Sequence, residues 1–128
     1  KLAAQPSDAT AHPLAASKLA HALGNTTIGV IAVAADLTVA EAKRVAIMAQ
    51  DGLARAIRPV HTPFDGDSLF VLAMGHEKLA DDAAQRAVAL AELGALAADC
   101  VTRAVARGVW CADSLGDMRG YRDCYAAD

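Results

Sequence analysis

Residues 27–34 read TIGVIAVA, and residues 68–74 read SLFVLAM. Both runs are short, apolar and rich in β-branched or large side chains, so we interpret each as a buried strand. Between them, residues 39–57 place apolar side chains on one helical stripe and charged side chains on another, which predicts an amphipathic helix. A strand–helix–strand order of this kind permits parallel pairing with a right-handed crossover.

The helix predicted over residues 39–57 has start and stop signals. Glu41 follows Thr38 by three residues, which is the spacing of a capping box. Pro59 ends the helix, because the residue before a proline avoids helical geometry. Gly52, together with Gly94 further along the chain, marks positions where helices are expected to pack closely. The expected apolar stripe consists of Ala42, Val45, Ala46, Ala49, Leu53, Ala56 and Ile57.

A second, longer helix is predicted from Asp82 to about Arg107. Its polar positions form only a narrow stripe, so we expect it to pack on more than one side, with Cys100 as a small core residue. Residues 75–82 are predicted to form a polar connection, and residues 108–128 an irregular tail. Because two strands do not make a stable sheet alone, we expect further strands from another part of the protein.

Composition narrows the classes of function. The formal net charge is −3 with acids and bases interspersed, so no basic face for nucleic acid is visible. No apolar run is long enough to span a bilayer, and the opening residues do not resemble a secretory signal. The three cysteines lack CxxC spacing and the histidines lack metal-ligand spacing, which predicts no disulfide framework, no metal and no cofactor. We therefore expect a cytoplasmic location.

Alanine occupies 32 of the 128 positions, so bulky core-forming residues are fewer than the apolar fraction suggests. A small domain also buries only a modest share of its surface. We therefore expect the chain to depend on a partner chain or on oligomerisation. Residues 14–23 are compatible with a short helix that Gly24 and Asn25 would end.

The first candidate site is the run Gly24-Asn25-Thr26-Thr27, directly before the first strand. If the Thr26 hydroxyl attacked the Asn25 carbonyl, an N-to-O acyl shift followed by hydrolysis would release Thr26 with a free α-amine. Such an amine titrates near about pH 8 and can act as the general base for the adjacent hydroxyl. Spacing alone favours a simpler interpretation, in which both threonines are ordinary β-branched residues after a Gly-Asn turn.

The second candidate site is Asp65-Gly66-Asp67, directly before the second strand. If the two strands are parallel neighbours, this loop lies near Thr26. One carboxylate would then orient the nucleophile or hold its ammonium group, and the other would bind a substrate amine. Asp-Gly pairs are also common in solvated turns, which is the simpler interpretation of this motif alone. His61, in the same loop, is interpreted as structural or solvent-facing.

In combination, these motifs resemble the DmpA-type aminopeptidases (peptidase family S58), which include β-peptidyl aminopeptidases and the nylon-oligomer hydrolase. The resemblance covers roughly residues 24–123 and lies in the order of several short motifs. These are NTTI at 25–28, DGLARAIRPVHT at 51–62, DGDSLF at 65–70 and GYRD at 120–123.

The resemblance implies a precursor that is cut into an α chain and a β chain. Residues 1–25 would then be the tail of the α chain, and residues 26–128 the β chain that carries the N-terminal nucleophile. Cleavage between Asn25 and Thr26 matches the nylon-hydrolase branch of the family. The implied fold is α/β (α+β), a four-layer αββα sandwich shared with ornithine acetyltransferases, of which this chain forms the C-terminal part.

The resemblance also implies which residues act. Thr26 matches the nucleophile, while Asp65 and Asp67 match the paired aspartates near it. The oxyanion-hole Asn, and a Lys and a Tyr near the nucleophile, are expected on the α chain. Family members hydrolyse amide bonds, commonly as aminopeptidases that act on small peptides or amides.

The expected partners are the protein's own α chain, a small peptide or amide substrate, and further αβ units in a homo-oligomer. No nucleic acid or membrane partner is expected. Two alternatives remain open. The chain could be a non-catalytic subunit or degenerate paralogue in which the Asn25–Thr26 bond stays intact, or, by analogy with the shared fold, part of an acyltransferase.

Overall fold

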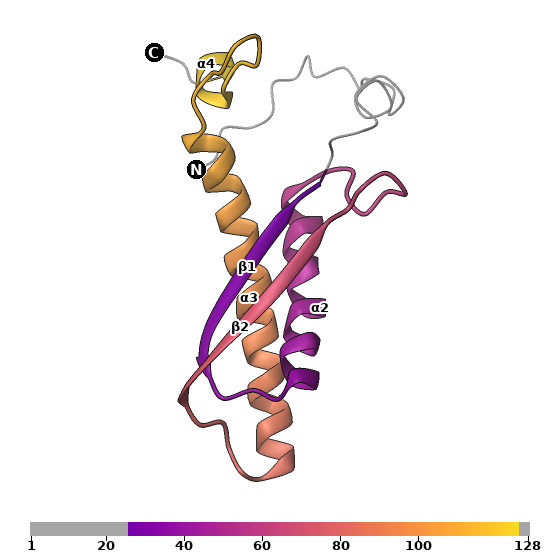
Figure 1. Cartoon of the computed structure of the whole chain (residues 1–128), viewed down its shortest axis with the longest axis vertical. Coiled ribbons are helices and arrows are strands. Elements are labelled where there is room, and N and C mark those ends of the chain that lie inside the picture. Colours follow the sequence, from indigo (N-terminus) through magenta and orange to yellow (C-terminus); the bar gives the residue numbers. More distant parts are fainter. Residues whose placement is uncertain (1–25, 126–128) are drawn as a thin grey trace.

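The computed structural model describes residues 26–125, which form a two-stranded parallel sheet with two long helices on one of its faces (Figure 1). The mixed α/β class and the strand–helix–strand–helix order are as predicted. The helix predicted over residues 14–23 lies outside the described residues. In chain order the elements are β1 (Ile28–Ala35), α2 (Val39–Ala56), β2 (Ser68–Glu77), α3 (Ala83–Cys111) and α4 (Tyr121–Tyr125).

Strand β2 is longer than its apolar run suggested. After a register shift near the end of β1, Ala35 pairs with Glu77. Asp36 continues this pairing by donating its backbone N–H to the Glu77 carbonyl at 2.7 Å. The prediction that a polar connection begins at Gly75 is therefore wrong, because pairing with the end of β1 keeps residues 75–77 in the strand, with Gly75 at a positive φ of 69° where the register shifts.

Helix α2 begins and ends close to where its sequence signals predict. The Thr38 backbone N–H donates to Glu41 Oε2 at 2.8 Å, and the Glu41 backbone N–H donates to Thr38 Oγ1 at 3.3 Å. These two bonds form the predicted capping box. The helix ends at Ala56, and Ile57 is already extended, two residues before Pro59.

The core lies between α2 and α3. Val45, Ala49 and Leu53 of α2 are fully buried, and they contact Ala97 and Val101 of α3. These three α2 residues belong to the predicted apolar stripe, which therefore faces α3. Burial of aliphatic side chains against each other is the main favourable contribution to this packing.

The two helices approach each other closely at two glycines. A Cβ atom built on Gly52 would lie 2.3 Å from the Ala98 carbonyl oxygen, and one built on Gly94 would lie 2.4 Å from Met48 Sδ. Both glycines are buried. The prediction that they mark close helix packing is confirmed.

Helix α3 extends four residues beyond the predicted end at Arg107 and reaches Cys111. The described residues cover it on one side only, and Leu96 on the other side is 61% exposed. Packing on more than one side is therefore absent within residues 26–125. Cys100 lies on the open side and is exposed, so its predicted core position is wrong. No helix in this described part has the length and apolar character needed to cross a membrane.

The tail after α3 is partly ordered as α4, which corrects the prediction of an irregular segment. Ser114 Oγ donates to the Asp123 carboxylate and accepts the Gly120 backbone N–H at 2.8 Å. Arg122 pairs with Asp113 at 2.6 Å. These contacts hold a five-residue helix that has no apolar run to predict it.

One face of the sheet is open. Side chains alternate along each strand, and Ile28, Val30, Phe70 and Leu72 are between 53% and 71% exposed. Figure 1 shows both long helices behind the strands, on the opposite face. The prediction of two fully buried strands is therefore wrong for the described residues, because α2 and α3 cover a single face. Large apolar side chains therefore remain uncovered on the other face.

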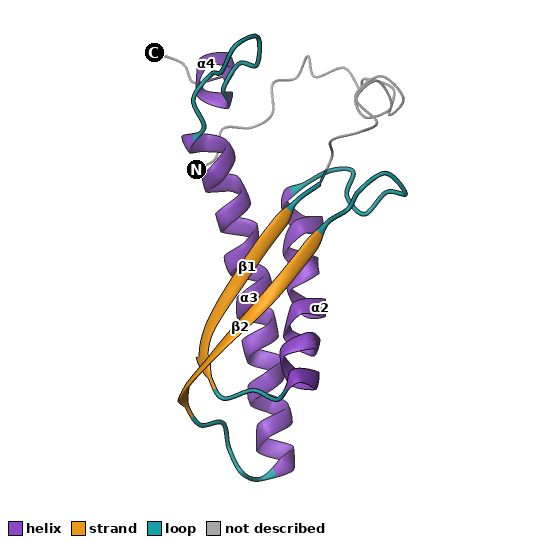
Figure 2. Cartoon of the chain, in the orientation of Figure 1, coloured by secondary structure: helices purple, strands orange, loops and turns teal. Residues whose placement is uncertain are grey.

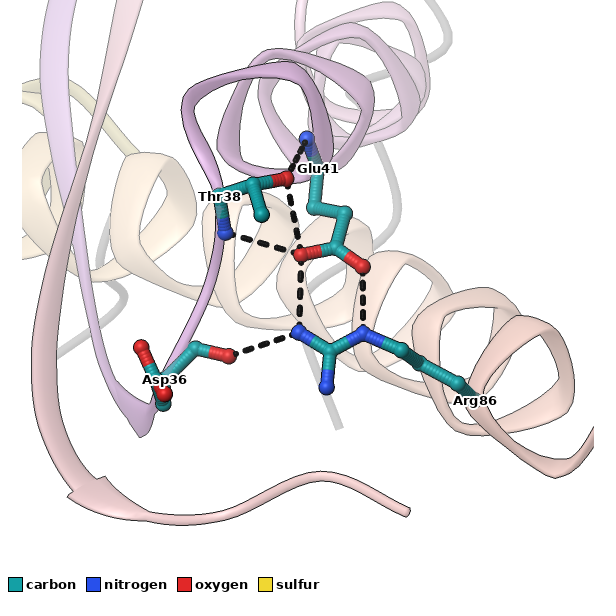
Figure 3. Close-up of polar contacts among 4 residues, drawn as sticks. All are labelled: Asp36, Thr38, Glu41 and Arg86. Carbon is teal, nitrogen blue, oxygen red and sulfur yellow. Dashed lines mark hydrogen bonds and ion pairs between the residues drawn. The ribbon is translucent and has the colours of Figure 1, made fainter. Parts of the chain in front are cut away.

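An ion pair joins the start of α2 to α3. Arg86 Nε donates to Glu41 Oε1 at 2.5 Å, and Arg86 Nη2 donates to Glu41 Oε2 at 2.9 Å (Figure 3). Arg86 Nη2 also donates to the Asp36 carbonyl oxygen at 3.1 Å. The Arg86 guanidinium, followed by the Thr38 backbone N–H, lowers the pKa of Glu41 from 4.5 to about 2.

This pair predicts a pH dependence of stability. Because the folded pKa of Glu41 lies below the unfolded value of 4.5, its stabilising effect is complete above that value. The effect is then lost as the pH falls towards about 2. We expect Glu41→Gln to lower the free energy of unfolding at neutral pH, with the difference from wild type shrinking over this window. Urea unfolding of both proteins at several pH values measures this difference in the free energy of unfolding. A difference that stays constant between pH 4.5 and about 2 would contradict the prediction.

Candidate active site

Parallel pairing brings the two candidate segments to the same end of the sheet. Ile28 lies opposite Ser68, and the Ser68 backbone N–H donates to the Thr27 carbonyl at 2.9 Å. The loop that precedes β2 therefore meets the residues that precede β1 (Figure 2). We expected residues 65–67 to lie near Thr26 only if the two strands were parallel neighbours. The structure contains this parallel pairing.

Asp67 is bound directly to the residue after Thr26. Its Oδ1 atom accepts the Thr27 backbone N–H at 2.9 Å. Its Oδ2 atom lies 3.1 Å from His61 Nδ1, and the Asp67 side chain is only 5% exposed. One buried carboxylate thus links the His61 loop to the start of β1.

Asp65 shapes the loop in which it lies. One of its carboxylate oxygens, Oδ2, accepts the Thr62 backbone N–H at 2.7 Å. Its own backbone N–H donates to the Thr62 carbonyl at 3.0 Å. These reciprocal bonds close a turn between His61 and Gly66. The turn therefore spans Thr62 to Asp65, and Gly66 follows it instead of forming part of it.

The Thr26 hydroxyl lies at an exposed edge of this arrangement. Thr26 is exposed, and a Cβ atom built on Gly66 would lie 2.9 Å from its Oγ1. The absence of a side chain at Gly66 therefore leaves space beside the hydroxyl. Because side chains alternate along an extended chain, Thr26 continues the row that Ile28 and Val30 form on the open face of the sheet.

An apolar hollow between β1 and α3 lies apart from these residues. It has a volume of about 280 Å³ and is lined by aliphatic side chains and Cys100. Neither Thr26 nor either aspartate lines it. Its aliphatic lining offers no group for amide chemistry, so we interpret it as a packing surface.

Other sequence-based candidates are placed as follows. Asn25 lies outside the described residues. Within residues 26–125, no group of three or more histidine, cysteine, aspartate or glutamate side chains is arranged to hold a metal ion.

The contact between His61 and Asp67 was not predicted from the sequence. His61 has a positive φ of 56°, an unusual backbone conformation for a residue with a side chain. The available signal was its position in the turn-rich run HTPFDGD, six residues before Asp67. Helical or strand periodicity carries no information about a contact formed inside such a loop.

Comparisons with known proteins point to one family. The family model described as Peptidase family S58 matches residues 4–123. An uncharacterized aminopeptidase of Mycobacterium bovis is 48% identical over 107 residues, which are 79% of this chain and 31% of that protein. An uncharacterized aminopeptidase of Mycobacterium leprae is 47% identical over 104 residues, covering 76% of this chain and 28% of that protein. The chain therefore spans about a third of the length of these curated relatives.

Proposed function

The chain belongs to peptidase family S58, and from this premise we propose that it carries the nucleophile of a self-processing amidohydrolase. Thr26 is the proposed nucleophile, and the bond between Asn25 and Thr26 is the proposed cleavage site. The proposed activity is that of an aminopeptidase that acts on small peptides or amides. The family assignment agrees with the resemblance inferred from the ordered motifs.

The first step of the proposed chemistry is self-cleavage. Thr26 Oγ attacks the Asn25 carbonyl carbon, and the proton of the hydroxyl passes to the Thr26 nitrogen as the peptide C–N bond breaks. The resulting ester between Asn25 and the Thr26 oxygen is then hydrolysed by water. The products are a new carboxylate at Asn25 and a Thr26 residue with a free α-amine and a free hydroxyl.

The second step uses both freed groups. The α-amine titrates at about pH 8 in model peptides, so roughly a tenth of it is neutral at pH 7 and can accept the hydroxyl proton. Thr26 Oγ then attacks the carbonyl of a substrate amide, the amine leaves with a proton, and an acyl ester remains on Thr26. Water hydrolyses this ester, which restores the hydroxyl and releases the acid.

One observation supports this assignment more than any other. An exposed Thr26 hydroxyl lies beside Gly66, and the next residue is bonded through its backbone N–H to the buried Asp67 carboxylate. This bond satisfies the Thr27 backbone N–H, which needs an acceptor where the strand begins, and it thereby fixes the chain directly after Thr26. A rigid strand end with a supporting hydrogen bond is a suitable place to hold a nucleophile.

The open face of the sheet supports a role for a partner chain. We propose that an upstream α chain packs against the row that includes Ile28 and Phe70, which would complete a four-layer αββα sandwich. Because Thr26 lies at the end of the same face, that chain would also supply the oxyanion-hole donors. Assembly of such αβ units into a homo-oligomer is part of the same proposal.

Product analysis of the full-length protein tests the proposed activity. We expect aminoacyl amides to be converted into the free amino acid and the free amine in equal amounts, also when a second amine is present as an acceptor. Transfer of the acyl group to that acceptor in place of water would identify an acyltransferase. An inactive protein with an intact bond between Asn25 and Thr26 would identify a non-catalytic subunit.

A further inference from the structure

The Asp67 carboxylate has a second contact that the proposed chemistry does not use. Its Oδ2 atom is buried and accepts no hydrogen bond from any donor among residues 26–125, and the His61 imidazole lies within ion-pair distance of it. A buried carboxylate oxygen without a donor is unfavourable, because it has lost its contact with water. His61 Nδ1 lies 3.1 Å from this oxygen, so a small rotation of the ring would let a hydrogen on that nitrogen reach it.

The backbone of the loop is arranged to make this contact. His61 adopts a φ of 56°, in the left-handed region that side chains seldom occupy. Its imidazole remains 40% exposed while Nδ1 faces the buried carboxylate. The Asp67 carboxylate therefore lies between a side-chain nitrogen at Oδ2 and the Thr27 backbone N–H at Oδ1.

We propose that His61 is a positioning residue that fixes the Asp67 carboxylate and, through it, the Thr27 amide next to the nucleophile. This inference rests on the proposed function of Thr26. With both carboxylate oxygens engaged, Asp67 has a single orientation, and the backbone bond that it accepts from Thr27 keeps Thr26 at the end of β1. Loss of the imidazole frees one oxygen and lets the carboxylate rotate away from Thr27.

Two substitutions at position 61 separate the effect of the imidazole from the effect of the backbone conformation. Glycine adopts positive φ freely, so His61→Gly removes the donor and preserves the loop. Asparagine also tolerates this conformation, and its side-chain NH₂ can donate from about the place of Nδ1. We expect His61→Gly to lower kcat for amide hydrolysis by about tenfold or more with little change in KM, since small displacements of a reacting group have effects of that size.

Rescue distinguishes positioning from a general effect on the fold. We expect His61→Asn to recover most of the kcat that His61→Gly loses. The rate of self-cleavage after Asn25 should likewise be highest in wild type, slightly lower in His61→Asn and lowest in His61→Gly. The matched control is His76→Asn, at an exposed position of β2, which should behave as wild type. Full activity of His61→Gly, or an asparagine variant no better than the glycine variant, would overturn the inference.

A measurement that does not need activity keeps the two proposals separable. In the full-length protein labelled with ¹⁵N-histidine, we expect the neutral His61 ring to carry its hydrogen on Nδ1, with the signal assigned through its loss in His61→Asn. Asp67→Asn should shift this preference towards Nε2. A neutral ring with its hydrogen on Nε2 would refute the contact even in an active enzyme. A wild-type protein that neither cleaves itself nor hydrolyses amides would instead refute the role of Thr26.

Discussion

Replacing Thr26 with alanine in the full-length protein is expected to abolish both cleavage after Asn25 and amide hydrolysis. Alanine lacks the oxygen that attacks the carbonyl in each reaction. Removal of the nucleophile lowers kcat by about 10⁶-fold in a serine hydrolase, and we expect a loss of that order here. Mass analysis of the purified chain and an assay of amine release measure the two losses separately.

Two other substitutions at Thr26 make the result specific to the hydroxyl. Thr26→Val keeps the β-branched shape without the oxygen, so it should be as inactive as Thr26→Ala. Thr26→Ser keeps the oxygen and should retain both reactions. Normal cleavage in Thr26→Ala would show that a different group attacks the Asn25 carbonyl.

Replacing Gly52 with alanine is expected to destabilise the protein by about 2 kcal/mol or more. The added methyl group would lie 2.3 Å from the Ala98 carbonyl oxygen and 2.7 Å from Val101 Cβ. The nearest of these atoms belongs to the backbone of α3, so a side-chain rotation cannot relieve the overlap and the helices must separate. This penalty exceeds the helix-propensity gain of about 1 kcal/mol that alanine provides over glycine.

Gly108 in α3 provides the matched control for Gly52. A Cβ atom there would meet nothing within 4 Å, so Gly108→Ala should stabilise the protein by up to about 1 kcal/mol. Urea unfolding of the two variants measures both effects. Equal stability of Gly52→Ala and wild type would show that α2 and α3 do not pack as closely as the structure indicates.

The sequence correctly predicted the helix start and the strand that depend on neighbouring residues alone. The Thr38–Glu41 capping box and the first strand are present within one residue of their predicted positions. The end of β2 was missed because residues 75–77 have no apolar side chain, and only pairing with β1 makes them part of the strand. The sequence predicted that a partner is needed, but not which face of the sheet and which side of α3 stay open, since periodicity shows which side chains are apolar but not what covers them.

The candidate site was predictable only in part. Residues 65–67 approach Thr26 because β1 and β2 are parallel neighbours, a condition that the motif spacing left open. The contact of His61 with Asp67 depends on a positive φ inside a loop, and no pattern of apolar residues encodes such a conformation. Family membership was predictable because it lies in the order of several motifs.

The most direct test of the account is the N-terminal residue of the small chain in the mature full-length protein. N-terminal sequencing or mass spectrometry of the intact chains should identify a chain that begins at Thr26 and reads Thr-Thr-Ile-Gly-Val. An active protein whose bond between Asn25 and Thr26 is still intact, or a small chain that begins at another residue, would contradict the account.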